Sequence, residues 1–122
     1  MPEEIQTILV VDDHPLMRKG ILQLIAMESS LRLVGEAGDG ERGLALALRE
    51  RPDLILLDLN MRGLSGLDML KALKATDLDS RVIVLTFSDS EEDVAAALRS
   101  GADGYLIRRC SHEIKVACCG EV

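Results

Sequence analysis

Five short apolar runs recur along the chain, and stretches with helical periodicity separate them. The runs occupy residues 8–11, 31–34, 54–57, 82–85 and 105–107. Three of them read ILVV, LILL and VIVL and are apolar at every position, which is typical of strands covered on both faces of a parallel sheet. We therefore predict five strands, of which these three are covered on both faces.

The stretches between the runs carry apolar stripes with the spacing of helices. The first stripe is Met17, Ile21, Leu24 and Ile25, and Pro15 suits the opening turn of that helix. The later three stripes are formed by Leu44 and Leu48, by Leu67, Leu70 and Leu73, and by Val94, Ala95 and Leu98. Strand and helix thus alternate, which predicts a doubly wound α/β domain with right-handed crossovers and helices on both faces of a parallel sheet.

The last segment, 109–122, departs from this pattern. A fifth helix from Ser111 to Gly120 is the expected continuation, although its apolar residues make a poor stripe. We therefore expect a fifth helix that is altered or truncated. The three cysteines all lie here, and an odd, clustered set predicts no disulfide framework.

Length, composition and charge narrow the class of protein. The chain of 122 residues is enough for one domain with a single core, and 48% hydrophobic with 29% charged residues is ordinary for a globular protein. Its net charge of −7 argues against a free-standing nucleic-acid-binding surface. No apolar run approaches the roughly 18 residues of a membrane span, so we expect a cytoplasmic protein with no membrane contact.

Polar residues follow four of the five runs directly, where ligands bind in open parallel sheets. Crowded carboxylates repel one another unless a cation lies among them, and Mg²⁺ suits such a site because it prefers oxygen ligands. If the strands are neighbours in the sheet, the cation together with a hydroxyl and a guanidinium would neutralise a phosphoryl group carried by Asp58. The residues are Asp12 and Asp13 after the first run, Asp58 after the third, Thr86 after the fourth, and Arg108 and Arg109 after the fifth.

The same positions carry a family resemblance. The motifs are VVDDHP at 10–15, LLDLNM at 56–61, LT at 85–86 and GADGYL at 101–106. Over residues 7–108 the chain resembles the receiver domains of bacterial response regulators, particularly the nitrate/nitrite regulators of the NarL/FixJ subfamily with LuxR-type output. The resemblance implies a flavodoxin-like (βα)5 fold with strand order 2-1-3-4-5. It also implies a two-component phosphoprotein that accepts a phosphoryl group from a sensor histidine kinase.

The resemblance assigns roles to residues of the acidic site. Asp58 would be the phosphoacceptor. Asp12 and Asp13 would bind Mg²⁺ together with Asp58 and the backbone carbonyl of Asn60. The domain would catalyse at most its own phosphorylation and dephosphorylation, so we do not expect an enzyme.

Further roles concern the switch that follows phosphorylation. The resemblance makes Thr86 the hydroxyl that moves onto the phosphoryl group and Tyr105 the aromatic ring whose rotamer follows. Arg108 stands where the family has lysine; it keeps the charge, but a planar guanidinium binds at different angles from an ammonium. Phe87 follows Thr86 where family members usually carry a smaller residue, and it would shield the phosphoryl group from water.

The C-terminal segment leads to two further expectations. Residues 109–122 do not resemble the fifth helix of the subfamily, and we expect 1–122 to be a single receiver domain without the DNA-binding output domain. DNA would then be contacted only through that missing domain. An altered fifth helix leaves part of the signalling surface open, so we also expect self-association as a homodimer or by exchange of C-terminal segments.

Two other functions remain as alternatives. A receiver-like module that no longer switches is compatible with Arg108 and the atypical tail. A Mg²⁺-dependent phosphohydrolase of the haloacid-dehalogenase type also uses an Asp at a strand end. Its motif, however, has a second carboxylate where this chain has Asn60.

Several features also have a purely structural interpretation. Asp12 and Asp13 could cap the first helix, and His14 is a metal ligand, a solvated neighbour of the carboxylates or a helix-start residue. The sequence GDGERG at 38–43 spells a dinucleotide-binding fingerprint, but it follows the second run rather than the first. We interpret it as a turn and a helix start.

Overall fold

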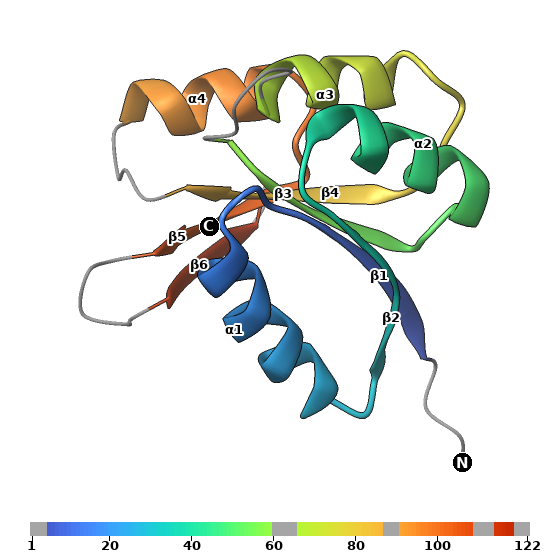
Figure 1. The fold of residues 1–122 in the computed structure, drawn as a ribbon. Helices are drawn as coiled ribbons and strands as arrows, with labels where there is room; N and C mark the ends of the chain where they lie inside the picture. The colour runs from blue at the N-terminus through green and yellow to red at the C-terminus, as the bar shows by residue number, and fades with distance from the viewer. Residues whose placement is uncertain (1–4, 60–65, 87–90, 109–113, 119–122) are drawn as a thin grey trace.

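The computed structural model describes residues 5–59, 66–86, 91–108 and 114–118, with side chains over 5–59, 66–85 and 95–105. Strands and helices alternate from the first element to the ninth, as the hydrophobic pattern predicts (Figure 1). The strands are β1 (Gln6–Val11), β2 (Leu31–Ala37), β3 (Leu54–Asp58), β4 (Arg81–Thr86), β5 (Gly104–Arg108) and β6 (Ile114–Cys118). The helices are α1 (Pro15–Ala26), α2 (Gly40–Glu50), α3 (Gly66–Lys74) and α4 (Glu91–Arg99).

In the described part of the chain these strands form one sheet in the order β2-β1-β3-β4-β5-β6. The first five are parallel and confirm the predicted order 2-1-3-4-5. Their carboxyl ends therefore lie at the same edge of the sheet. Register places Val11 opposite Leu57 and Asp58 opposite Leu85, so the residues that end β1, β3 and β4 are neighbours.

Helices cover both faces of the sheet, and each face has its own core. On one face α2, α3 and α4 pack on β-strand residues such as Leu9 and Leu57, whereas α1 packs on the other face against Val10 and Leu56 (Figure 1). Alternate residues of β1 and β3 thus face opposite layers, as the all-apolar runs require. Within the described ranges, every helix is too short or too polar to cross a lipid bilayer.

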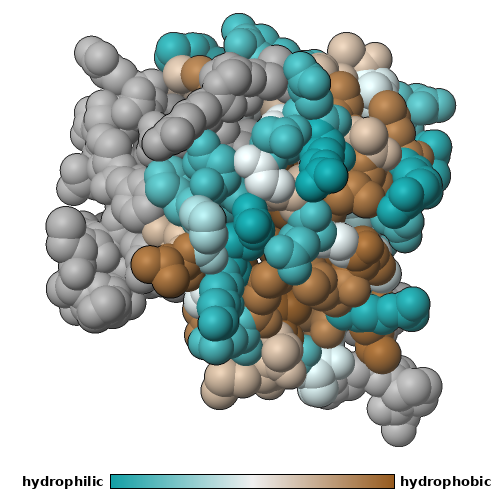
Figure 2. Space-filling model, in the orientation of Figure 1, coloured by the Kyte–Doolittle hydropathy of each residue, from teal (hydrophilic) through white to brown (hydrophobic). Residues whose placement is uncertain are grey.

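The α1 side carries more exposed apolar surface than a fully covered layer would. Figure 2 shows brown, apolar surface in the lower half of this view, where Figure 1 places α1 and β2. The exposed apolar side chains here are Leu16 and Leu24 of α1, Met27 directly after α1, and Leu33 of β2.

The predicted fifth helix, Ser111–Gly120, is wrong. Residues 114–118 instead form β6, which pairs antiparallel with β5, with Arg108 opposite Ile114 and Gly104 opposite Cys118. Two physical reasons favour the strand. The segment lacks a helical apolar stripe and contains the β-branched residues Ile114 and Val116, and its backbone satisfies the edge of β5 that would otherwise stay unpaired.

The glycine-rich sequence at 38–43 forms the predicted turn and helix start. Asp39 is the N-cap of α2, and its side chain accepts a hydrogen bond from the backbone N–H of Arg42 at 2.7 Å. A Cβ added to Gly43 would lie 2.8 Å from Val11 and 2.9 Å from Met69. This glycine therefore allows α2 to lie close to the sheet.

Candidate functional site

Two buried aspartates lie side by side at the carboxyl edge of the sheet. Asp12 follows the last residue of β1 and Asp58 is the last residue of β3, and each is only 1% exposed. Because Val11 pairs with Leu57, register alone brings the two carboxylates together. Asp13, which is partly buried, completes the predicted set of three carboxylates.

The fourth member of the group is His14. Its Nδ1 lies 3.2 Å from Asp12 Oδ1, 3.1 Å from Asp13 Oδ1 and 3.1 Å from Asp58 Oδ2. The backbone N–H of His14 also donates to Asp12 Oδ1 at 2.8 Å, which fixes the turn from β1 into α1. His14 is itself the N-cap residue of α1, and Pro15 follows it. The alternative that the two aspartates merely cap this helix is therefore not what the geometry shows.

The surroundings of His14 favour its protonated form. Desolvation lowers the pKa of the imidazole, but the hydrogen bonds to Asp12 and Asp58 and the charges of Asp58 and Asp13 outweigh it, so the pKa is raised above 6.5. In the absence of a metal, an imidazolium therefore offsets part of the charge of the three carboxylates.

The donor set fits a divalent cation. One ligand atom from each of Asp12, Asp13, His14 and Asp58 lies within 4.8 Å of all the others. Asp12 Oδ2 is buried and has no hydrogen-bond partner among the described residues, which is costly unless a cation is bound there. Carboxylate oxygens are the ligands that Mg²⁺ prefers.

Two residues that the sequence analysis did not single out support this site. Arg18, one turn into α1, donates from Nη1 to the backbone carbonyl of Asp12 at 2.6 Å and pairs through Nε with Glu36 at 3.2 Å. Gly66, at the start of α3, lies so close to the chain after β3 that an added Cβ would overlap the carbonyl of Asp58 and lie 2.6 Å from the Cα of Leu59. Only the spacing of Arg18, four residues after His14 and on the helix that follows it, could have indicated its role.

The remaining predicted site residues lie at the same edge or outside the described residues. Thr86 ends β4, one residue beyond the Leu85 that pairs with Asp58, and Arg108 ends β5. Tyr105 in β5 is partly buried against the core on the α3 and α4 face. Asn60 and Phe87 lie outside the described residues.

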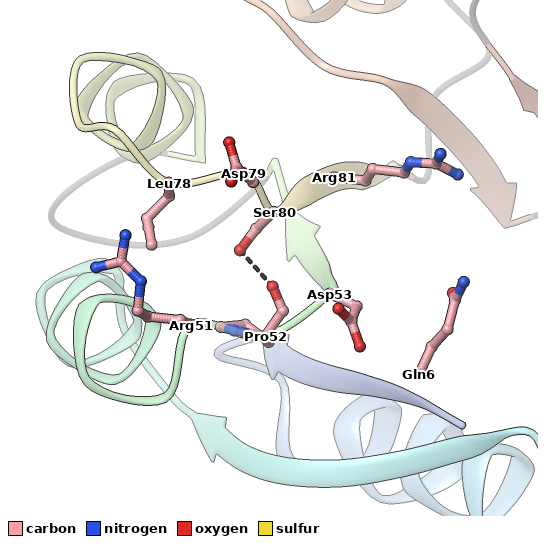
Figure 3. A pocket seen from close by; sticks show the side chains of 8 residues that line it. All are labelled: Gln6, Arg51, Pro52, Asp53, Leu78, Asp79, Ser80 and Arg81. Atoms are coloured by element: carbon pink, nitrogen blue, oxygen red, sulfur yellow. Dashed lines mark hydrogen bonds between the residues drawn. The ribbon is translucent and has the colours of Figure 1, made fainter. Parts of the chain in front are cut away.

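At the opposite end of the sheet, a hollow of about 370 Å³ lies among the starts of the strands (Figure 3). There Ser80 donates to the carbonyl of Pro52, and Asp53 accepts hydrogen bonds from both the backbone N–H and the hydroxyl of Thr7. Positively charged arginines and negatively charged aspartates both line this hollow. It is lined by Gln6, Arg51, Pro52, Asp53, Leu78, Asp79, Ser80 and Arg81.

Comparison with known proteins identifies the family. The model of the response regulator receiver domain matches residues 8–116, which is most of the chain. The chain belongs to this family. Receiver domains typically bind Mg²⁺ at an acidic pocket, and this chain has a group of acidic side chains at Asp12, Asp13 and Asp58. The receiver domain is a signalling module rather than a catalytic enzyme, so the phosphohydrolase alternative falls.

Individual relatives agree with the resemblance. The receiver domain is 51% identical over 106 residues to the nitrate/nitrite response regulator protein NarL of Escherichia coli K12, covering 87% of this chain and 49% of that protein. It is 48% identical to a Haemophilus influenzae homologue, covering 83% and 49%. The chain thus spans about half the length of these curated relatives. The solved receiver domain of Mycobacterium tuberculosis NarL superposes with a TM-score of 0.82 at 37% identity, covering 87% of this chain and 85% of that one.

Proposed function

We propose that Asp58 accepts a phosphoryl group from a sensor histidine kinase and that this reaction is the input step of a cytoplasmic two-component signalling pathway. The observation that supports it best is the position of the Asp58 carboxylate. It is buried at the end of β3, yet it lies beside two further carboxylates at the sheet edge where phosphate ligands bind in such folds. A carboxylate that only ended a strand would not need two further carboxylates beside it.

The proposed chemistry is phosphoryl transfer to a carboxylate oxygen. An oxygen of Asp58 forms the new bond to phosphorus while the bond between phosphorus and the donor's leaving group breaks. Asp12, Asp13 and Asp58, with the backbone carbonyl of Asn60, would hold the Mg²⁺ ion. When bound, Mg²⁺ supplies charge neutralisation for the crowded oxygens.

The signal would leave the site through Thr86 and Tyr105. Both lie on strands adjacent in the sheet, and Tyr105 pairs with Val84, two residues before Thr86. We propose that the Thr86 hydroxyl moves onto the phosphoryl group and that the Tyr105 ring changes rotamer in response. Arg108, at the end of β5, would bind the phosphoryl group in place of the family lysine.

Intact mass spectrometry tests the phosphoacceptor directly. With Mg²⁺ and a small-molecule phosphodonor, we expect a mass gain of one phosphoryl group that is lost in Asp58→Asn and without Mg²⁺. Asp77→Asn is the matched control, because the Asp77 side chain is 99% exposed at the other end of the sheet. A gain that persists in Asp58→Asn would overturn the proposal.

Arg108→Lys separates phosphorylation from switching. We expect the variant to be phosphorylated as the wild type is, but to show a larger change in the NMR signal of Tyr105 on phosphorylation, because an ammonium matches the family geometry. No difference in either measurement would mean that Arg108 is equivalent to lysine. A module that no longer switches would leave the Tyr105 signal unchanged in the wild type.

We further propose that 1–122 is one receiver unit that reaches DNA only through an output domain and that it self-associates. The β6 strand supports self-association, since it is the last strand of the sheet and its outer edge pairs with no strand among the described residues, which suits a second copy or an exchanged segment. Light scattering should show a mass that rises with concentration. A constant monomer mass would contradict self-association.

A further inference from the structure

We propose that His14 is a metal-ligating side chain and that the site of Asp12, Asp13 and Asp58 binds a divalent transition-metal ion, such as Ni²⁺ or Zn²⁺, more tightly than Mg²⁺. The inference shares its carboxylates with the proposed function. It concerns the nitrogen ligand, which phosphorylation does not need.

The distances around Nδ1 are those between donors of one metal ion. Three oxygens from three residues lie 3.1–3.2 Å from this single nitrogen. With metal–ligand bonds of about 2.1 Å, neighbouring donors lie about 3.0 Å apart in an octahedron and about 3.4 Å apart in a tetrahedron. A proton on Nδ1 points toward one oxygen and cannot serve all three equally, whereas a cation among the four donors can.

The unsatisfied oxygen of Asp12 is a second, independent observation. Asp12 Oδ1 already accepts the backbone N–H of His14, so the carboxylate is held in one orientation. Its other oxygen, Oδ2, is buried without a hydrogen-bond partner among the described residues. A buried oxygen with free lone pairs is expected where a ligand such as an ion binds.

The local sequence holds the imidazole in place before any ion binds. His14 has extended backbone angles, φ −99° and ψ 104°, and the following Pro15 restricts it to that region. The side chain is 47% exposed, so its outer edge faces solvent while Nδ1 faces the carboxylates. The ring is therefore preorganised, and an ion has a path to it.

The chemistry of the ligand atoms decides which ion the imidazole of His14 would bind best. Mg²⁺ prefers oxygen ligands and keeps several waters, so one imidazole adds little to its binding. Imidazole nitrogen suits Zn²⁺, Ni²⁺ and Cu²⁺, and the affinity of a mixed nitrogen and oxygen site rises from Mn²⁺ through Co²⁺ and Ni²⁺ to Cu²⁺. Adding His14 to three carboxylates thus shifts the preference of the site toward these ions.

Calorimetric titration of the full chain with Mg²⁺, Ni²⁺ and Zn²⁺ tests the preference. We expect His14→Gln to weaken Ni²⁺ and Zn²⁺ binding by at least about 10-fold and to change Mg²⁺ binding much less. The chain has only one other histidine, and His112→Gln is the matched control, in which all three affinities should stay as in the wild type. Equal losses for all three ions in His14→Gln would overturn the role of His14 as a selective ligand.

A measurement on the unmutated protein guards against a folding artefact. With ¹⁵N-labelled histidine, Zn²⁺ should shift the Nδ1 resonance of His14 and leave that of His112 in place. If Mg²⁺ binds but Zn²⁺ moves no His14 resonance, the inference fails while the phosphoacceptor site stands. If Asp58→Asn abolishes phosphorylation while Zn²⁺ still shifts His14, the two proposals hold separately. If no divalent cation binds at all, both fail.

Discussion

Two aspartates stand at opposite ends of β3, and they serve opposite purposes. Asp53 precedes the strand and accepts two hydrogen bonds from Thr7, whose hydroxyl in turn accepts from the Asp53 backbone N–H at 2.9 Å. Asp58 ends the same strand and is buried among other acids. The carboxylate at the amino end is satisfied within the fold, and the carboxylate at the other end is crowded by like charges. This difference shows that the destabilising groups of the fold are concentrated at the carboxyl end of β3, where the candidate site lies.

The largest effect should come from disturbing the close contact that positions Asp58. In Gly66→Ala the new methyl group would overlap the backbone after β3, so that the start of α3 or the end of β3 must move. We expect a loss of about 3 kcal/mol in the free energy of unfolding, together with weaker Mg²⁺ binding. Urea unfolding and calorimetry measure the two quantities.

Gly20→Ala is the control for Gly66→Ala, because nothing lies within 4 Å of its added Cβ and it lies within α1. It should leave Mg²⁺ binding intact and keep or raise stability, since alanine favours a helix. Wild-type behaviour of Gly66→Ala would mean that the backbone after Asp58 relaxes freely.

Substituting Asp53 and Asp58 in turn tests directly whether the two carboxylates differ in their effect on stability. In metal-free protein, Asp53→Ala should lower the free energy of unfolding by about 1–2 kcal/mol, because it removes the acceptor of two hydrogen bonds. Asp58→Asn should leave it equal or higher, because it removes one of three crowded charges and its amide oxygen can still accept from His14. Urea unfolding in a chelator measures both.

Ligand binding should reverse the order of these variants. Saturating Mg²⁺ is expected to stabilise Asp53→Ala as it does the wild type, and to stabilise Asp58→Asn far less. If Asp58→Asn were as unstable as Asp53→Ala without metal, the acidic cluster would be a structural element rather than a binding site.

The positions of the carboxylates could be predicted from the sequence, because the apolar runs show where each strand ends. Once the runs at 8–11 and 54–57 are parallel strands that lie next to each other, as the strand order implied by the family resemblance places them, Asp12 and Asp58 come together at one edge. The same reasoning failed for the tail, where the expectation of a helix at 111–120 gave way to β6, because pairing with β5 outweighed a weak helical pattern. The role of Gly66 depends on a tertiary approach that no local pattern records, and His14 depends on the direction in which its ring points.

The smallest expected effect concerns the charge of His14 beside the three carboxylates. In metal-free protein the raised pKa of His14 means that its protonated form stabilises the fold. That contribution is full below the unfolded pKa of 6.5 and is lost as pH rises through the higher folded pKa.

The wild type should therefore lose stability relative to His14→Gln as pH rises from about 6 to about 8.5. The loss should be less than about 1 kcal/mol, because water screens a half-exposed ring. His112→Gln should keep the wild-type slope, and Asp53→Ala should keep it too, because Asp53 lies at the end of the sheet remote from the imidazole. A flat difference between wild type and His14→Gln would mean that the three carboxylates do not rely on the imidazolium.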